Sequence, residues 1–229
     1  MHNSFHTLMS LFLFGLLCAA CATTKLAPEL PIKPIEKYLH RQEKDGLVFA
    51  LEPLSDPRQL REYFGDNLLK KGILPVLVVA QNRNDIETYI VSEESVSMNP
   101  GTDQGTGNVR ESKGIASSAE ARDAVYEKDY EGVRLAIIAP ILLPAAFVDW
   151  GPTEHSKSVQ QSIMSKALRR KSLVPGQSYS GCIYIKLPPD GSYDEAITIV
   201  LTAEKLKDGD SLRFTFPVNI SAAIGKGVK

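Results

Sequence analysis

The chain lacks an excess of charge of either sign. Its 26 lysine and arginine residues nearly balance its 27 aspartate and glutamate residues, which gives a formal net charge of −1. All of these residues follow residue 20, so the rest of the chain is equally close to neutral. A nucleic-acid surface needs a clustered basic excess, and the short basic group at Lys166 and 169–171 is explained as the complement of a helix dipole. We therefore expect no nucleic-acid partner.

Histidine and cysteine are scarce, which removes most patterns of metal ligands and nucleophiles. Beyond residue 20 the histidines are His40 and His155, and neither has a second histidine or a cysteine at metal-ligand spacing. The chain has no Gly-x-Ser-x-Gly motif. The glycine-rich run Gly101–Gly107 lacks the Lys-Ser/Thr of a phosphate loop, and Asp208–Asp210 offers too few calcium ligands and is predicted as a hairpin turn. We expect no metal, no cofactor and no enzyme activity.

No apolar run is long enough to cross a bilayer, which needs about 20 helical residues. The run Leu8–Leu17 has the length of a secretory signal, and Ala19, Ala20 and Cys21 follow it. This ending resembles the signal sequence of a bacterial lipoprotein. The resemblance implies a diacylglyceryl group on Cys21, cleavage just before it and, because Ala22 follows, an outer-membrane protein that faces the periplasm. The alternative is an ordinary signal peptide cut after Ala20 or Ala22.

A lipidated Cys21 has consequences for the rest of the chain. The small, polar and proline-rich residues 22–34 suit a tether between the membrane and a folded domain. With Cys18 removed and Cys21 acylated, Cys182 stands alone and no intramolecular disulfide can form. Cys182 lies in a strand-like run, which favours a packed, inert thiol; the alternative is a reactive or intermolecular thiol.

Short alternating runs separated by turn residues predict a mainly β fold, an antiparallel, immunoglobulin-like β-sandwich with a helical and apolar insertion. Asp56 and Pro57 predict a helix start, and Gly65 or Gly72 a helix end. The expected strands are 47–51, 73–80, 88–91, 95–98, 179–187, 196–203 and 212–218, with the last three pairing in sequence order, and the expected later helices are 119–130 and 156–170. The expected organisation is a signal peptide over 1–20, a lipid-anchored tether over 21–44, a domain over 45–220 in which 99–171 are the insertion, and a tail over 221–229.

The order of these segments resembles a group of uncharacterised bacterial outer-membrane lipoproteins. The shared features are a Gly-Ile-Leu-Pro-Val strand that leads to an Asn-containing turn (72–84), a helical, apolar insertion, and a segment (165–176) that leads into the Ser-Gly-x-x-Tyr strand 180–184. The resemblance implies a fold and a location, and it implies no reaction.

One feature exceeds what a plain sandwich requires, the apolar stretch Leu135–Val148. It is too short to span a membrane, and Pro140 and Pro144 interrupt helical hydrogen bonding. One interpretation is that it completes the core. The other is that it contacts the membrane or a partner; the candidate contact residues are Leu135, Ile138, Ile141, Leu142, Leu143, Phe147 and Trp150.

These observations together predict a non-catalytic, lipid-anchored envelope protein that acts as a binding or scaffolding module on the periplasmic side of the outer membrane. Its expected partners are the membrane, through lipidated Cys21, and an envelope protein. Two alternatives stay open: a periplasmic enzyme that acts on envelope polymers, and a structural component of a secretion or envelope machine.

Overall fold

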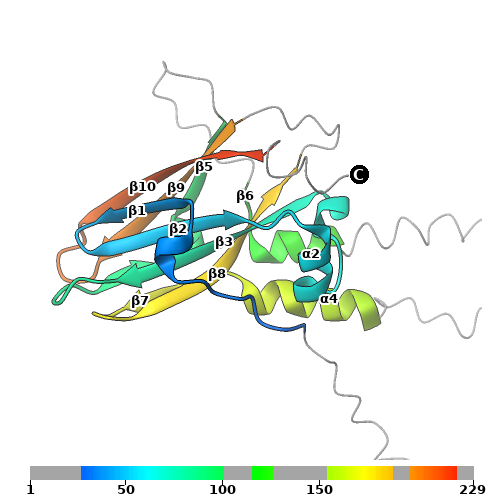
Figure 1. Cartoon of the computed structure of the whole chain (residues 1–229), viewed down its shortest axis with the longest axis horizontal. Helices are drawn as coiled ribbons and strands as arrows, with labels where there is room; N and C mark the ends of the chain where they lie inside the picture. The colour runs from blue at the N-terminus through cyan, green and yellow to red at the C-terminus, as the bar shows by residue number, and fades with distance from the viewer. Residues whose placement is uncertain (1–26, 101–114, 126–153, 188–195, 221–229) are drawn as a thin grey trace, which may run out of the picture.

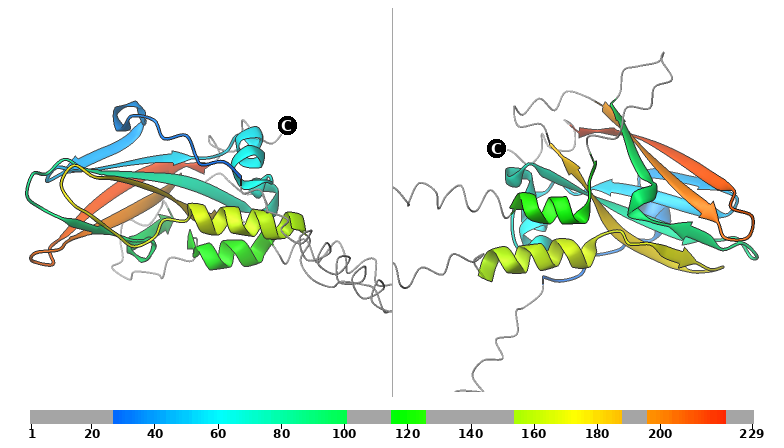
Figure 2. Two further views of the ribbon diagram at one scale, coloured as in Figure 1. Left: turned by 90° about the horizontal axis from the view of Figure 1, so that it is seen from below. Right: turned by 180° about the vertical axis from the view of Figure 1, so that it is seen from behind.

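The computed structural model describes residues 27–100, 115–125, 154–187 and 196–220. In these residues the fold is mainly β, and its strands form two antiparallel sheets (Figure 1). The helices gather at one end of the two sheets, and the tightest strand connections lie at the other (Figures 1 and 2).

The first sheet has the order β1-β2-β3-β8-β6. Its strands are β1 (His40–Lys44), β2 (Leu47–Pro53), β3 (Ile73–Asn82), β8 (Ser178–Lys186) and β6 (Ile115–Ala116). Strands β2 and β3 are buried on both faces, because the second sheet covers one face and the N-terminal segment with the short helix η1 (Ile35–Lys37) lies against the other (Figure 2). This explains why their sequences are continuously apolar rather than alternating.

The second sheet has the order β10-β9-β4-β7, and β5 also pairs with β9. Its strands are β10 (Ser211–Asn219), β9 (Ala196–Lys205), β4 (Tyr89–Val91), β7 (Lys171–Leu173) and β5 (Val96–Pro100). Buried and exposed residues alternate along β10, as expected for a sheet with one solvated face. Between β4 and β5 the turn of 3-10 helix η3 (Glu93–Ser95) bulges out of the ladder, and Ser92 and Ser95 bond each other's backbone as a capping box.

The two sheets meet along β1 and β10. The side chain of Gln42 on β1 donates to the carbonyl of Thr215 on β10 and accepts from the amide of the same residue at 3.2 Å. Behind this seam, the Phe49 and Phe214 rings pack edge to face with their centroids 4.8 Å apart. Apolar side chains of both sheets and of the helices form one core.

The helix start predicted from Asp56 and Pro57 is confirmed. Asp56 caps α2 (Pro57–Phe64) by accepting from the Arg58 amide at 2.8 Å, and Gly65 ends the helix at a φ of 83°. The short helix η2 (Leu68–Lys71) follows and ends at Gly72, whose φ is 73°. Both glycines therefore stand where a left-handed backbone is needed.

Helix α4 (Glu154–Lys166) begins two residues before the predicted range and ends four residues before its end. It stops there because the next residues bond to β8: the Leu168 amide donates to the Cys182 carbonyl at 2.8 Å. The backbones approach so closely that a Cβ on Gly181 would lie 2.6 Å from the Cα of Leu168. A further helix covers residues 118–125.

The predicted pairing of three C-terminal strands in sequence order is wrong in its first half. Strands β9 and β10 pair antiparallel along their full length, but β8 pairs with β3 and β6 in the other sheet. Strand β8 is buried over Gly181–Ile185 on both faces, so it belongs beside β3, which is also buried on both faces, rather than beside a half-exposed strand.

Pro75 is the third residue of β3, and β3 lies between β2 and β8 rather than at a sheet edge. The Pro75 carbonyl accepts from the Leu54 amide at 2.9 Å. In an antiparallel strand the nitrogen of a residue points the same way as its carbonyl, and the β2 ladder ends at the pair Pro53–Val76. The missing N–H of Pro75 therefore faces Leu54, which lies just beyond the last residue of β2, so no bond between paired strand residues is lost.

Several predictions lie outside the described residues. These are the signal peptide, Cys21, the Gly101–Gly107 loop and the apolar stretch with its candidate contacts. Within the described ranges, no helix combines the length and the hydropathy that crossing a bilayer requires.

Candidate functional site

Four turns meet at the end of the molecule opposite the helices, and we call this surface the loop end (Figure 1). It comprises residues 45–46, 83–88, 174–177 and 206–210. Backbone hydrogen bonds continue the pairing of neighbouring strands into the turns. The Arg83 amide donates to the Gly46 carbonyl at 2.7 Å, the Gly176 amide to the Asn82 carbonyl at 2.9 Å and the Leu206 amide to the Thr88 carbonyl at 2.9 Å.

The first turn, Asp45-Gly46, closes the β1–β2 hairpin. Both residues have positive φ, 47° and 74°, as a two-residue hairpin of the favoured twist requires. Gly46 is needed for a second reason, because a Cβ there would lie 2.8 Å from the backbone nitrogen of Asn84. The hairpin tip is thus pressed against the β3–β4 turn.

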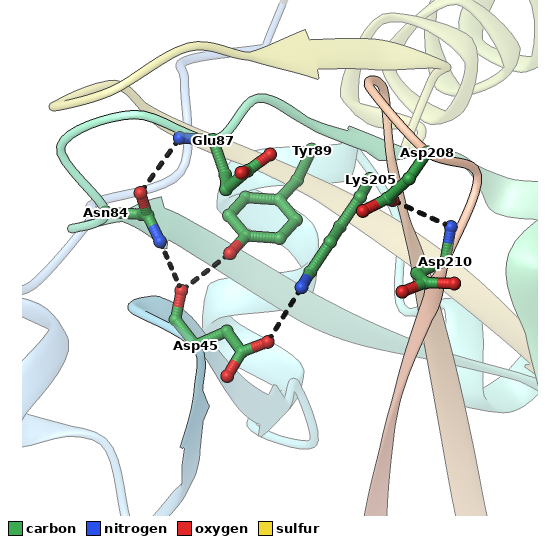
Figure 3. A network of polar contacts seen from close by, with 7 residues as sticks. All are labelled: Asp45, Asn84, Glu87, Tyr89, Lys205, Asp208 and Asp210. Atoms are coloured by element: carbon green, nitrogen blue, oxygen red, sulfur yellow. Dashed lines mark hydrogen bonds and ion pairs between the residues drawn. The ribbon is translucent and has the colours of Figure 1, made fainter.

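Asn84 shapes that second turn and ties it to the first. Its side-chain oxygen accepts from the amides of Ile86 and Glu87, both at 2.8 Å. Its side-chain nitrogen donates to the Asp45 carbonyl at 3.0 Å (Figure 3). One short amide side chain therefore fixes two turns at once.

Tyr89 and Lys205 hold the other side of Asp45 (Figure 3). The Tyr89 hydroxyl donates to the Asp45 carbonyl at 2.6 Å, and the Lys205 ammonium lies 3.0 Å from the Asp45 carboxylate. Burial, followed by the nearby Asp45 carboxylate, raises the pKa of Tyr89, and the hydrogen bond to Asp45 raises the pKa of Lys205. Tyr89 is therefore neutral and Lys205 charged at neutral pH.

Buried Asn82 connects the two sheets beneath this network. Its side-chain nitrogen donates to the carbonyls of Glu87 at 2.7 Å and Leu173 at 2.9 Å, and its side-chain oxygen accepts from the Asn84 amide at 2.9 Å. Because the buried Asn82 amide makes all of these bonds, it stabilises a single arrangement of the two sheets and the turn between them.

The β9–β10 turn completes the loop end, and it is the hairpin turn predicted from the sequence. Gly209 has a φ of 77°, and the Asp210 amide donates to the Asp208 carboxylate at 3.0 Å (Figure 3). In the part of the chain that the structure describes, no three histidine, cysteine or acidic side chains are grouped as metal ligands. The polar network at the loop end fixes backbone turns and so presents a rigid surface.

A second region of interest is the half of the molecule that carries the helices. Lys166, at the end of α4, donates to the Ala27 carbonyl at 3.3 Å and lies 5.8 Å from the centre of the Phe64 ring. Burial lowers the pKa of Lys166, which the nearby Cys182 and Glu29 oppose. This lysine therefore binds the first described residues of the chain to the domain.

Glu93 is a half-buried carboxylate in the same half, and burial raises its pKa. Both of its oxygens are engaged at the start of helix 118–125, where the Ser118 amide donates at 2.6 Å and the Ser118 hydroxyl at 3.3 Å. Ser117 and Glu120 bond each other's backbone there as a capping box, at 2.8 and 3.2 Å. The carboxylate thus serves a helix N-terminus.

The structure places the remaining residues that the sequence singled out. Cys182 is a buried free thiol, and burial raises its pKa to about 12, which confirms the packed position and disfavours the reactive alternative. His40 is half-buried on β1, and His155 is exposed in the first turn of α4. Arg169 donates to the Met164 carbonyl at 3.0 Å, so it serves the helix C-terminus as expected.

Sequence reasoning missed the loop-end residues Asp45, Asn84, Tyr89 and Lys205. The dipeptide Asp45-Gly46 before an apolar run is a hairpin signal and could have revealed strand β1. The contact between Asp45 and Lys205 joins residues far apart in the chain and leaves no local signal.

The chain was compared with protein-family models and with curated proteins, and neither comparison gave a match.

Proposed function

We propose that the protein is a non-catalytic, lipid-anchored binding or scaffolding module on the periplasmic side of the outer membrane, built on an immunoglobulin-like sandwich. The apolar run Leu8–Leu17 followed by Ala19, Ala20 and Cys21 supports the anchor. The contact of Lys166 with Ala27 shows where the described N-terminal segment lies on the domain. Cys21 lies only six residues before Ala27. Six residues span at most about 20 Å, so a lipid on Cys21 would hold the domain close to the membrane surface.

The geometry of the polar residues supports binding rather than catalysis. The polar side chains bond to the protein's own turns and helix start. The bonds that fix turns come from Asn82, Asn84, Tyr89 and Lys205, and Glu93 bonds to the start of a helix. A rigid surface of this kind suits recognition, because little conformational freedom is lost when a partner binds. The proposed membrane attachment rests on two or three acyl chains, since one chain alone binds a membrane only marginally.

The anchor is tested by changing Cys21 to Ser in the full chain expressed in a Gram-negative host. We expect the variant to lose palmitate labelling, to accumulate as uncleaved precursor and to leave the outer-membrane fraction. A Cys182→Ala variant is the control, and it should keep label and location. Persistent labelling of Cys21→Ser protein in membranes would show that the lipid anchor is assigned to the wrong residue.

A further inference from the structure

The loop end carries an unusual share of exposed apolar side chains. Five large apolar residues are exposed among the described residues, and three of them, Ile86, Val174 and Leu206, lie on three joined turns of the loop end. Their exposed fractions are 80, 43 and 58 per cent. Single exposed apolar residues are ordinary, but a group of them on one surface marks a site of contact.

These side chains are presented on fixed backbone. The Ile86 amide is bonded to the Asn84 side chain at 2.8 Å, and the Leu206 amide to the Thr88 carbonyl at 2.9 Å. Val174 begins a turn that closes with a bond from the Gln177 amide at 3.1 Å, and Gly176 supplies the positive φ of 77° that this turn needs. The loop end is therefore arranged before any partner arrives.

The charges around this apolar group are mostly negative. Arg83 forms an ion pair with Glu36, and Lys205 forms one with Asp45. The other charged groups of the four turns are one ammonium, that of Lys207, and four carboxylates, those of Asp85, Glu87, Asp208 and Asp210. An acidic rim favours a basic partner and is repelled by anionic lipid headgroups.

The position of the proposed anchor also favours a protein partner over lipid, and this step rests on the proposed function. The N-terminal segment begins beside α4, in the helical half of the molecule, and the loop end lies at the far end of both sheets (Figures 1 and 2). An anchor on the helical side leaves the loop end directed away from the membrane, where it meets proteins rather than lipid.

We propose that the loop end is a docking surface for a protein segment that carries apolar side chains flanked by lysine or arginine. Ile86, Val174 and Leu206 supply the apolar contact, and Asp85 and Asp208 the charge selection. Desolvated apolar contacts surrounded by a charged rim are the usual arrangement of such interfaces.

The test uses two labelled peptides of equal length, one of alternating leucine and lysine and one of alternating leucine and glutamate. Binding to the full chain in non-ionic detergent is followed by fluorescence anisotropy. We expect the leucine–lysine peptide to bind about tenfold more tightly or better than its acidic counterpart. The double variant Ile86→Ser/Leu206→Ser should weaken this binding by a similar factor, and Asp85→Lys should reduce the preference for the basic peptide.

Leu39→Ser is the matched control, because Leu39 is 96 per cent exposed and lies on the N-terminal side of β1, away from the loop end. It should leave peptide binding unchanged, and all variants should keep the melting temperature, since the replaced side chains are exposed. Equal binding of the two peptides, or an equal loss with Leu39→Ser, would overturn the proposal.

Two further outcomes would also overturn it in favour of another occupant. One is binding of the Cys21→Ser chain to phosphatidylethanolamine–phosphatidylglycerol vesicles that the double variant loses. The other is a concentration-dependent dimer that the same variant abolishes. Cys21→Ser protein that keeps its palmitate label and its membrane location, and still prefers the leucine–lysine peptide, would overturn the anchor alone and leave the docking surface supported.

Discussion

Gly46 shows how one residue sets the geometry of the loop end. It needs both a positive φ and the absence of a side chain, since its α-carbon faces the backbone of Asn84. Asn84 in turn holds the amides of Ile86 and Glu87. A change at Gly46 is therefore transmitted to a turn that is distant in sequence, through contact rather than through the chain.

We expect Gly46→Ala to destabilise the domain more than Gly209→Ala does. Both replacements force alanine into the left-handed region, which costs about 1–2 kcal/mol. Only Gly46 adds a close contact, 2.8 Å to the Asn84 nitrogen, whereas nothing lies within 4 Å of a Cβ on Gly209. Overpacking adds about 1–3 kcal/mol, so urea unfolding should separate the two variants by that amount. Equal free energies of unfolding would mean that the hairpin tip shifts freely.

Cys182 should be protected from thiol reagents in the native state. In a chain that starts at Ala22 it is the remaining thiol, and its burial predicts slow labelling at pH 8 that becomes fast in urea. Rapid labelling of native protein would contradict the packed position.

The same burial predicts a loss of stability in alkali. The pKa of Cys182 is raised from 9.0 to about 12 in the folded state, so the unfolded chain ionises first. This contribution to stability is present below pH 9 and is lost as the pH rises toward 12, with a slope of up to about 1.4 kcal/mol per unit. Denaturation series should show a shallower alkaline decline in Cys182→Ala than in the parent chain.

At the scale of elements, the seam between β1 and β10 depends on side chains rather than on a strand ladder. Gln42 bonds both the amide and the carbonyl of Thr215, and the Lys44 ammonium bonds the Arg213 carbonyl. Strand β10 is an edge of its sheet, and an uncovered edge can pair with another chain. These side chains occupy that edge.

We expect Gln42→Ala to lower the free energy of unfolding by about 1 kcal/mol and to promote self-association. The lost bonds leave an amide and a carbonyl of β10 without the partner that covers them. Sedimentation at increasing concentration measures the association. Gln59→Ala, on the exposed side of α2, is the control and should change neither property. A monomeric Gln42→Ala protein would show that the edge is protected by other means.

Local signals predicted local elements well. Asp56, Pro57 and Gly65 mark the start and end of α2 within ten residues, and Asp208–Asp210 marks a turn that the structure confirms. The prediction of strand pairing failed where the partner is distant in the chain. Strand β8 directly precedes β9 in sequence, but it is buried on both faces and pairs with β3. Nothing within either strand specifies this choice without its neighbours.

The candidate site was less predictable than the fold. Asp208–Asp210 was recognised as a turn from its own residues, whereas its place beside Thr88 arises only when the sheets assemble. Strand β1 was missed because its sequence, His40–Lys44, is polar and carries no apolar alternation; it forms because β2 offers a free edge and Asp45-Gly46 makes the hairpin.

At the scale of the whole molecule, two features define opposite ends. Lys166 binds the first described residues in the helical half, and the four turns form the loop end. The helix that covers residues 118–125 and helix α4 both lie at the helical end (Figures 1 and 2). The apolar stretch Leu135–Val148 falls between them in sequence, so its role bears on how that end is used.

The two interpretations of this stretch make opposite predictions for one measurement. If it completes the core, the double change Ile138→Asp/Leu142→Asp should lower the melting temperature of an unlipidated chain that starts at Ala22. The cost should be about 3–5 kcal/mol, because each aspartate either buries an unpaired charge or displaces a large side chain. If the stretch contacts lipid or a partner, the melting temperature should stay nearly unchanged.

We expect destabilisation. The matched control is Ile86→Asp, an exposed apolar residue of the loop end that should tolerate the same charge without loss of stability. Vesicle binding is measured on both variants, because a contact surface would lose it while the fold persists. An unchanged melting temperature together with lost vesicle binding would assign Leu135–Val148 to the membrane, and the protein would then hold lipid at its helical end and present the loop end to partners.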